Sequence, residues 1–138
     1  MNILVTGSAG FIGSQLCLKL LDRGDNVFGI DNLNDYYNVE LKKERLNRHF
    51  NHENYHHYAI DIANKEQLEE IFSCNTIDIV VNLAAQAGVR YSIENPDVYI
   101  QSNIVGFMNI LECSRHYKIS NLVYASSSSV YGANLTMP

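Results

Sequence analysis

The 138-residue chain has the length of one domain, and 46% of its residues are hydrophobic, which is enough for a buried core. Its formal net charge is −5 and its ten basic residues are scattered, so neither nucleic acid nor an anionic membrane is an expected partner. The three cysteines are odd in number and far apart, and no apolar run reaches the roughly 18 residues of a membrane helix, which favours reduced thiols and a cytoplasmic protein.

The chain begins with a pattern typical of a strand, a tight turn and a helix. The apolar run 3–5 leads into a turn that contains Gly7, Gly10 and Gly13, and a helical pattern follows. Glycines at this spacing allow the bend, the approach of a pyrophosphate and close packing of the helix on the strand. A structural turn without a ligand is the alternative. The buried face of the helix is expected to carry Ile12, Leu16, Cys17, Leu20 and Leu21.

A second apolar run, over residues 26–30, ends in Asp31. A carboxylate about twenty residues past the first glycines can accept a hydrogen bond from a ribose 2′-hydroxyl. A 2′-phosphate would face that negative charge, and no arginine directly follows Asp31. The expected cofactor is therefore NAD rather than NADP.

The GxxGxxG spacing resembles that of the extended short-chain dehydrogenase/reductase family, whose members act on sugar nucleotides and carry a Rossmann cofactor domain. The resemblance extends the expected cofactor site to Phe11 and Ile12. The stretch 31–38, with Leu-Lys after it, is similar to a loop of the UDP-glucuronate 4-epimerases in this family. That similarity implies that Asp31 and Asn32 lie by the adenosine ribose, with Lys42 or Lys43 near a cofactor phosphate. On composition alone, the stretch fits a polar loop before a surface helix.

Residues 58–62 are expected to form a third short strand, and a capping box at 64–67 predicts the helix after it. The resemblance gives Asp61 and Ile62 a contact with the adenine, whereas a simple strand-end aspartate is the alternative. Histidines at positions 49, 52, 56 and 57 come close together in the sequence. No cysteine or acidic cluster completes a ligand set around them, so no metal site is expected.

The nearly continuous apolar run over residues 77–85 is typical of a central parallel strand that is covered on both faces. In the resembled family such a strand passes beneath the nicotinamide ribose, which places Leu83, Ala84 and Ala85 in the cofactor site. Packing of small residues against a helix explains the alanines equally well. The loop 86–92 is again similar to that of the epimerases. Its Arg90 is a candidate to pair with a substrate carboxylate or diphosphate, with a surface arginine as the alternative.

The longest expected helix opens at Asn95 and Pro96. The resemblance implies that Asn103 touches the cofactor and that the 96–116 helix builds half of a dimeric four-helix bundle in the full-length enzyme. The expected core contacts are Val98, Ile104, Phe107, Leu111 and Cys113. Ile100, Met108 and Ile110 fit the homodimer contact, although burial within the domain would also explain them.

The last expected strand, over residues 121–125, runs into four serines and a Val-Tyr-Gly segment. Counting back from that segment, Ser127 matches the catalytic Ser/Thr of the family, and Ser128 and Ser129 are candidates to bind substrate. A flexible serine-rich turn is the alternative.

The family's catalytic base is a tyrosine with a lysine four residues later, which lowers the pKa of the phenol. None of the nine tyrosines in this chain has a lysine at that position. Residues 1–138 are therefore expected to form the NAD(P)-binding Rossmann domain at the N-terminus of a longer enzyme, without its C-terminal substrate domain. The expected fold is α/β, with a doubly wound parallel sheet in the strand order 3-2-1-4-5.

The resemblance implies that the parent enzyme is a nucleotide-sugar epimerase that interconverts UDP-glucuronate and UDP-galacturonate at C4 through transient oxidation by bound NAD. This chain alone is expected to be inactive. Its partners would be a UDP-sugar and, in the parent, a second copy of the same subunit. The alternatives are another nucleotide-sugar epimerase, dehydratase or decarboxylase of the family, and a non-catalytic dinucleotide-binding module.

Overall fold

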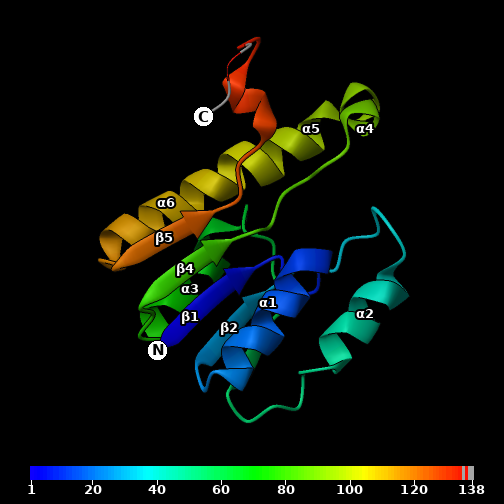
Figure 1. The fold of residues 1–138 in the computed structure, drawn as a ribbon. Helices are drawn as coiled ribbons and strands as arrows, with labels where there is room; N and C mark the ends of the chain where they lie inside the picture. Colours follow the sequence, from blue (N-terminus) through cyan, green and yellow to red (C-terminus); the bar gives the residue numbers. More distant parts are fainter. Residues whose placement is uncertain (135, 137–138) are drawn as a thin grey trace.

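The computed structural model describes residues 1–134 and 136, which form a parallel sheet with helices on both faces (Figure 1). The five strands pair in the order β3-β2-β1-β4-β5, which confirms the expected doubly wound topology. At the centre, Val5 of β1 lies opposite Gly29 on one side and Val81 on the other. The strands are β1 (Asn2–Thr6), β2 (Asn26–Ile30), β3 (Tyr55–Tyr58), β4 (Ile79–Asn82) and β5 (Asn121–Tyr124).

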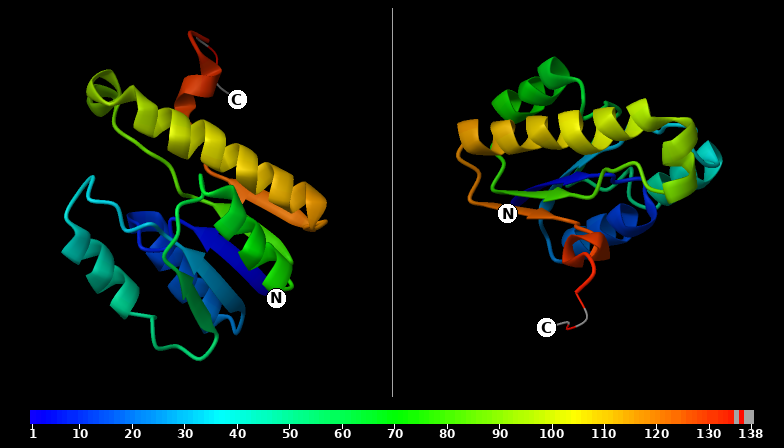
Figure 2. Two further views of the ribbon diagram at one scale, coloured as in Figure 1. Left: turned by 180° about the vertical axis from the view of Figure 1, so that it is seen from behind. Right: turned by 90° about the horizontal axis from the view of Figure 1, so that it is seen from above.

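The helices form one layer on each face of the sheet, as the views from behind and from above show (Figure 2). One layer contains α1 and α2, and the other contains α3 and the long helical run from α5 to α6. The bounds are α1 (Phe11–Asp22), α2 (Val39–Asn47), α3 (Lys65–Cys74), α4 (Val89–Glu94), α5 (Pro96–Tyr99), a π-helical segment η1 (Ile100–Gly106), α6 (Phe107–His116) and a 3-10 turn η2 (Ser128–Tyr131).

The central strand β1 is buried on both faces, as a parallel strand between two helical layers must be. Because side chains alternate along a strand, Leu4 packs toward α3 and α6 while Ile3 and Val5 pack toward α1. All three side chains are almost fully buried. The two hydrophobic clusters thus fix the sheet between its helices and hold the carboxyl ends of the strands at one edge.

The third strand occupies Tyr55–Tyr58, so the expectation of a strand over 58–62 was wrong. Its partner β2 ends at Ile30, which pairs with Tyr58, and the ladder ends there. Beyond it, the Asp61 carboxylate accepts a hydrogen bond from the Ala63 amide at 2.8 Å, which turns the chain toward α3. Asp61 therefore lies in a turn past the strand.

The long helical run packs on a different face from the one its apolar residues predict. Ile110 is fully buried, whereas Ile104 is 59% exposed and Leu111 is 38% exposed, which reverses the expected assignment of these three residues. Small and polar residues make the contact instead. A side chain at Gly106 would overlap Ile62, and the Asn109 amide donates to the Ile62 carbonyl oxygen at 3.0 Å. The loop before α3 lies so close to the long helical run that only small or polar side chains fit at the point of contact.

Candidate functional site

A cavity of about 420 Å³ opens at the carboxyl ends of β1, β2 and β4. This is where the strand order reverses, and open α/β sheets bind their ligands at that point. Every residue expected to bind the cofactor lines this cavity except Asn103. The lining residues from that set are Gly7, Gly10, Phe11, Ile12, Gly13, Asp31, Asn32, Asp61, Ile62, Leu83, Ala84 and Ala85.

The turn between β1 and α1 brings the backbone close to the cavity. Gly7 has a φ of +70°, and a Cβ there would stand 3.0 Å from the Ala84 amide nitrogen. A Cβ at Gly13 would overlap the Gly7 carbonyl oxygen. The first bond of α1 runs from the Ser14 amide to the Gly10 carbonyl oxygen, and a helix leaves the amides before that point available to a ligand. The turn therefore has the composition and the position of an anion-binding helix start.

The first turn of α1 projects beyond the edge of the sheet. Phe11 is 75% exposed and Ile12 is 63% exposed, and both side chains line the cavity. The expectation that Ile12 belongs to the buried face of the helix was wrong, because the face that packs on the sheet begins with Gly13 and Ser14. Apolar atoms therefore form one wall at the mouth of the site.

Asp31 organises the edge of the site at the end of β2. One of its carboxylate oxygens accepts from the Ala9 amide at 3.1 Å and the other accepts from the Leu33 amide at 2.9 Å. The side chain is buried yet lines the cavity. A carboxylate has about four acceptor positions, so these two bonds leave room for a ribose hydroxyl.

Asn32 and Asp61 join the ends of β2 and β3 beside Asp31. The Asn32 amide donates to the Asp61 carboxylate at 2.8 Å, and the Asn32 side-chain oxygen accepts from the Asn34 amide. Ile62 is 3% exposed and supplies an apolar surface next to this polar pair. Only the family resemblance predicted that Asn32 and Asp61 share a site, and the structure shows the hydrogen bond that connects them.

Of the two lysines considered on α2, Lys42 reaches the site. Its ammonium group donates to the Asn34 side-chain oxygen at 2.7 Å and lies 4.0 Å from the Asp31 carboxylate. Burial lowers the pKa of Lys42, and the Asp31 carboxylate opposes that shift. Lys43 is exposed and pairs with Glu40 at 2.7 Å. Lys42 thus offsets the negative charge of Asp31 inside the lining of the cavity.

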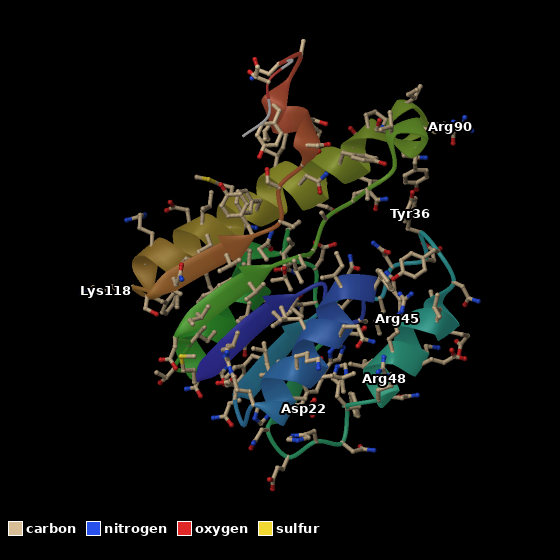
Figure 3. All side chains as sticks on the ribbon, in the orientation of Figure 1. Asp22, Tyr36, Arg45, Arg48, Arg90 and Lys118 are labelled. Carbon is tan, nitrogen blue, oxygen red and sulfur yellow. The ribbon has the colours of Figure 1, made fainter. Side chains whose placement is uncertain are left out.

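Arg45 also lines the cavity, although it is not among the residues expected from the sequence. Its guanidinium donates to the Tyr37 hydroxyl at 3.0 Å and lies 5.8 Å from the ring of Phe11. Figure 3 shows Arg45 on the side of α2 that faces α1. The signal available in the sequence was the spacing of three residues from Lys42, which places both cations on one helical face.

Thr6 ties the ends of β1 and β4 together beneath the site. Its hydroxyl donates to the Asn82 side-chain oxygen at 2.7 Å and accepts from the Leu83 and Ala84 amides at 3.1 and 3.0 Å. Thr6 is fully buried. These bonds set Ala84 against Gly7, where a larger turn residue would not fit. No local sequence pattern points to Thr6, because its partners lie more than seventy residues away in the chain.

Asn103 lies behind the cavity wall and acts on Gln86. The Asn103 amide donates to the Gln86 carbonyl oxygen at 2.9 Å, and its oxygen accepts from the Gln86 amide at 2.8 Å. Gln86 lines the cavity, as does Ser102 from the same π-helical segment. π-Helical turns frequently occur at functional sites. In this structure Asn103 reaches the site through Gln86.

This geometry agrees with the comparisons with known proteins. Residues 4–138 match the protein family described as GDP-mannose 4,6 dehydratase. The chain belongs to this family. The family is part of the extended short-chain dehydrogenase/reductases, so the match confirms the resemblance inferred from the glycine spacing.

Individual members of the family are similar over the whole chain. Protein CapI of Staphylococcus aureus is 59% identical over 138 residues, and the UDP-glucuronate 4-epimerase of Thermodesulfobacterium geofontis is 51% identical over 93% of the chain. A crystal structure of UDP-glucuronic acid 4-epimerase from Bacillus cereus with UDP-glucuronic acid and NAD has a TM-score of 0.89 at 35% identity over the whole chain. The chain spans 41% of the length of CapI, 40% of that of the Thermodesulfobacterium protein and 44% of the Bacillus cereus chain.

The expected catalytic residue, Ser127, and the expected substrate residues lie outside the cavity lining. Ser127 caps η2, because its hydroxyl oxygen accepts from the Ser129 amide at 3.2 Å while the hydroxyl donates to the Ser129 oxygen at 3.1 Å. Ser127, Ser128 and Ser129 are exposed. Arg90 is exposed on α4 and projects from its outer side (Figure 3). The structure brings the cofactor residues together but leaves these four beside the site.

The clustered histidines belong to packing contacts. His49 packs edge-on against Tyr55, with ring centroids 4.4 Å apart, and His56 stacks on Phe28 at 5.2 Å. Among residues 1–134 and 136, no group of three or more His, Cys, Asp or Glu residues has the arrangement of a metal site. The helices within the same residues also lack the length and hydropathy needed to span a membrane.

Proposed function

We propose that this chain binds NAD and forms the cofactor-binding part of a nucleotide-sugar epimerase that interconverts UDP-glucuronate and UDP-galacturonate at C4. The observation that carries the proposal is the cavity at the ends of β1, β2 and β4, where the glycine turn and the Asp31 carboxylate line the same space. The similarity to UDP-glucuronate 4-epimerases over 93% and 100% of the chain supports the choice of reaction.

The residues of the cavity fit NAD at two points. The glycines at 7, 10 and 13 let the turn pack closely on its own backbone and on residues 83–84, where a Cβ would collide, and a helix leaves its first amides without an intrahelical acceptor, which suits a pyrophosphate. Asp31 keeps acceptor capacity beside that turn, which suits the hydroxyls of a ribose. Lys42 lies 4.0 Å from Asp31 and limits the repulsion between this carboxylate and the phosphates.

Bound NAD supplies a hydride acceptor for oxidation at the sugar C4 and a donor for return to the opposite face, so that no net redox change results. In this proposal Ser127 orients the C4 hydroxyl, and Ser128, Ser129 and Arg90 bind the sugar nucleotide. The proton acceptor of the family is a tyrosine with a lysine four residues later, which this chain does not contain. We therefore expect the 138-residue chain to bind NAD without catalysing epimerisation.

A second candidate reaction is the epimerisation of UDP-glucose. The UDP-glucose 4-epimerase of Thermotoga maritima, solved with UDP-glucose, is 38% identical to this chain with a TM-score of 0.83. The glycine turn and Asp31 do not separate the two substrates, because they face the cofactor. The loops 31–38 and 86–92 favour the glucuronate reaction by their similarity to the UDP-glucuronate 4-epimerases.

The test has a binding arm and a turnover arm. Calorimetric titration of the chain with NAD should show saturable binding that the Asp31→Ala substitution weakens, with the exposed Asp97→Ala as the matched control. Epimerisation should then be assayed on UDP-glucuronate and UDP-glucose for the chain and for the longer gene product. Absence of NAD binding would contradict the cofactor proposal. If the longer product turns over UDP-glucose but not UDP-glucuronate, UDP-glucose replaces UDP-glucuronate as the proposed substrate. NAD binding without turnover of either sugar by the longer product would favour a non-catalytic module.

We also propose that the helical run 96–116 contributes to a homodimer of the full-length enzyme. Four apolar side chains on this run are exposed at spacings of three or four residues, which gives one continuous stripe. They are Ile100, Ile104, Met108 and Leu111. Cross-linking or sedimentation of the full-length protein, with Met108→Lys as the disrupting variant, tests this contact.

A further inference from the structure

Two loops meet across the mouth of the cavity, one after β2 and one after β4. β2 and β4 flank β1 on opposite sides, so their loops border the glycine turn from both directions. Tyr36 lines the cavity on the β2 side and Gln86 lines it on the β4 side. A ligand held by the turn would therefore lie between these loops.

An aromatic contact joins the loops. The rings of Tyr36 and Tyr91 are 4.9 Å apart at their centroids and tilted by 50°, which is within the range of favourable aromatic pairs. Figure 3 shows Tyr36 reaching from the loop after β2 toward α4, where Tyr91 lies. Tyr36 is 42% exposed, so the hydrophobic core does not determine its position.

The residues around this pair leave space for it. Gly88 has a φ of +100°, and a side chain there would collide with the Tyr36 hydroxyl. The Tyr99 hydroxyl donates to the Ala87 carbonyl oxygen at 2.9 Å and also to that of Gly88, which holds the loop after β4 against α5. On the other side, the bond between Lys42 and Asn34 holds the loop after β2 against α2. Both halves of the contact are thus anchored to helices.

We infer that Tyr36 and Tyr91 form a clasp across the cofactor cavity that slows the release of bound NAD. The inference rests on the proposed NAD binding and adds a residue pair that acts on retention. A ligand that enters or leaves between the two loops must separate the rings, so their contact contributes to the barrier for both steps and slows release. Retention suits a reaction in which the cofactor is restored in each cycle and need not exchange.

The test measures the rate of NADH release. The chain is loaded with NADH and mixed rapidly with excess NAD, and the loss of nicotinamide fluorescence is followed. Tyr36→Leu and Tyr91→Leu should each raise the release rate about 3- to 10-fold, and the association rate should rise with it, because entry crosses the same contact. Because both substitutions remove one contact, the double variant should release NADH at the rate of either single variant. Tyr36→Phe, which keeps the ring, should stay near the wild-type rate.

The matched control is Tyr124→Leu, which removes another exposed ring from an aromatic pair, with Phe107 at 5.1 Å, outside the cavity lining. This variant should release NADH like the wild type. If the wild type binds NADH but both leucine variants release it at the wild-type rate, or if their effects multiply in the double variant, the clasp is refuted while the proposed cofactor site stands. If the wild type does not bind NADH, the proposed function fails and the clasp fails with it.

Discussion

The side chain of Asn103 makes the same pair of hydrogen bonds to Gln86 that a neighbouring strand would make. Its amide donates to the Gln86 carbonyl oxygen and its oxygen accepts from the Gln86 amide, at 2.9 and 2.8 Å. β4 ends at Asn82, so this side chain supports the backbone of the loop beyond the strand. A polar residue on a helix thereby fixes the wall of the cofactor cavity.

Asn103→Asp should weaken this wall. The carboxylate can still accept from the Gln86 amide, but it cannot donate to the carbonyl oxygen and places a negative charge beside it. We expect the free energy of unfolding in urea to fall by about 1–2 kcal/mol, and the NAD affinity to fall with it. Asn121→Asp, at an exposed position on β5, is the control. Unchanged stability and affinity in Asn103→Asp would show that Gln86 needs no such support.

Gly13→Ala should disrupt the glycine turn. The added methyl group would overlap the Gly7 carbonyl oxygen, and this atom belongs to the turn itself. The backbone must shift, which we expect to cost about 1–3 kcal/mol of stability and to reduce NAD affinity at least about tenfold. Gly24→Ala is the control, because Gly24 has a φ of +86° with nothing within 4 Å of a Cβ. It should lower stability by about 1–2 kcal/mol while NAD affinity stays the same.

Lys42→Met and Lys43→Met should differ, although the residues are adjacent. Loss of the Lys42 ammonium group leaves the Asn34 oxygen and the buried Asp31 carboxylate without their cation, so unfolding should become easier by about 1–3 kcal/mol. NAD binding should weaken as well, since Asp31 would then face the phosphates uncompensated. Lys43 makes an exposed ion pair, and its loss should change stability by about 0.5 kcal/mol or less. Equal effects in urea unfolding and calorimetry would contradict the assignment of Lys42 to the site.

Acid should destabilise the fold through His49. This side chain is 3% exposed, and burial, reinforced by the charge of Arg48, lowers the pKa of His49 from 6.5 to about 4. Between these values the unfolded chain binds a proton that the folded chain does not bind. The free energy of unfolding should therefore fall as the pH falls from 6.5 toward 4, by at most about 3 kcal/mol from this residue.

His49→Phe tests the acid effect because it keeps a ring against Tyr55 and removes the titrating group. Unfolding by urea across this pH range should show a flatter profile for the variant than for the wild type. His57, whose pKa burial also lowers, should supply part of the remaining slope in both proteins. The exposed His116, which packs edge-on against Tyr117, gives the control His116→Phe, which should follow the wild-type profile. A wild-type slope in His49→Phe would exclude His49 as the cause.

The parts of the site that the sequence predicted are local motifs. The spacing of Gly7, Gly10 and Gly13 predicts where a turn meets a helix, and Asp31 is recognisable because it comes directly after the end of a predicted strand. The roles of Thr6 and Arg45 could not be predicted from the sequence, because they depend on partners that the sheet and the packing of α2 on α1 bring close. No short-range pattern records a hydroxyl that binds amides 77 and 78 residues away.

The long helix shows a different reason for failure. Periodicity assumes that the most apolar stripe faces the core, yet the stripe that packs inward contains Gly106, Asn109 and Ser114 together with Ile110 and Cys113. The loop at 61–63 approaches this helix too closely for large side chains and presents carbonyl oxygens to Asn109. Large apolar residues such as Ile104 and Leu111 therefore lie on the exposed face of the run. The π-helical segment adds to the error, because it breaks the 3.6-residue repeat on which the prediction relied.

The pairing of β1 with β4 also bears on the order in which the molecule folds. β1 and β2 are joined by one helix, whereas Thr6 and Asn82 are 76 residues apart in the chain. Contacts of such separation form late, because the intervening chain must first be ordered. The Asp31 side of the site can thus assemble from the first two strands alone, while the side with Ala84 must wait for the fourth. Binding of dinucleotide during refolding would report the arrival of β4, and substitution of Thr6 should delay that arrival more than it slows the earlier pairing of β1 with β2.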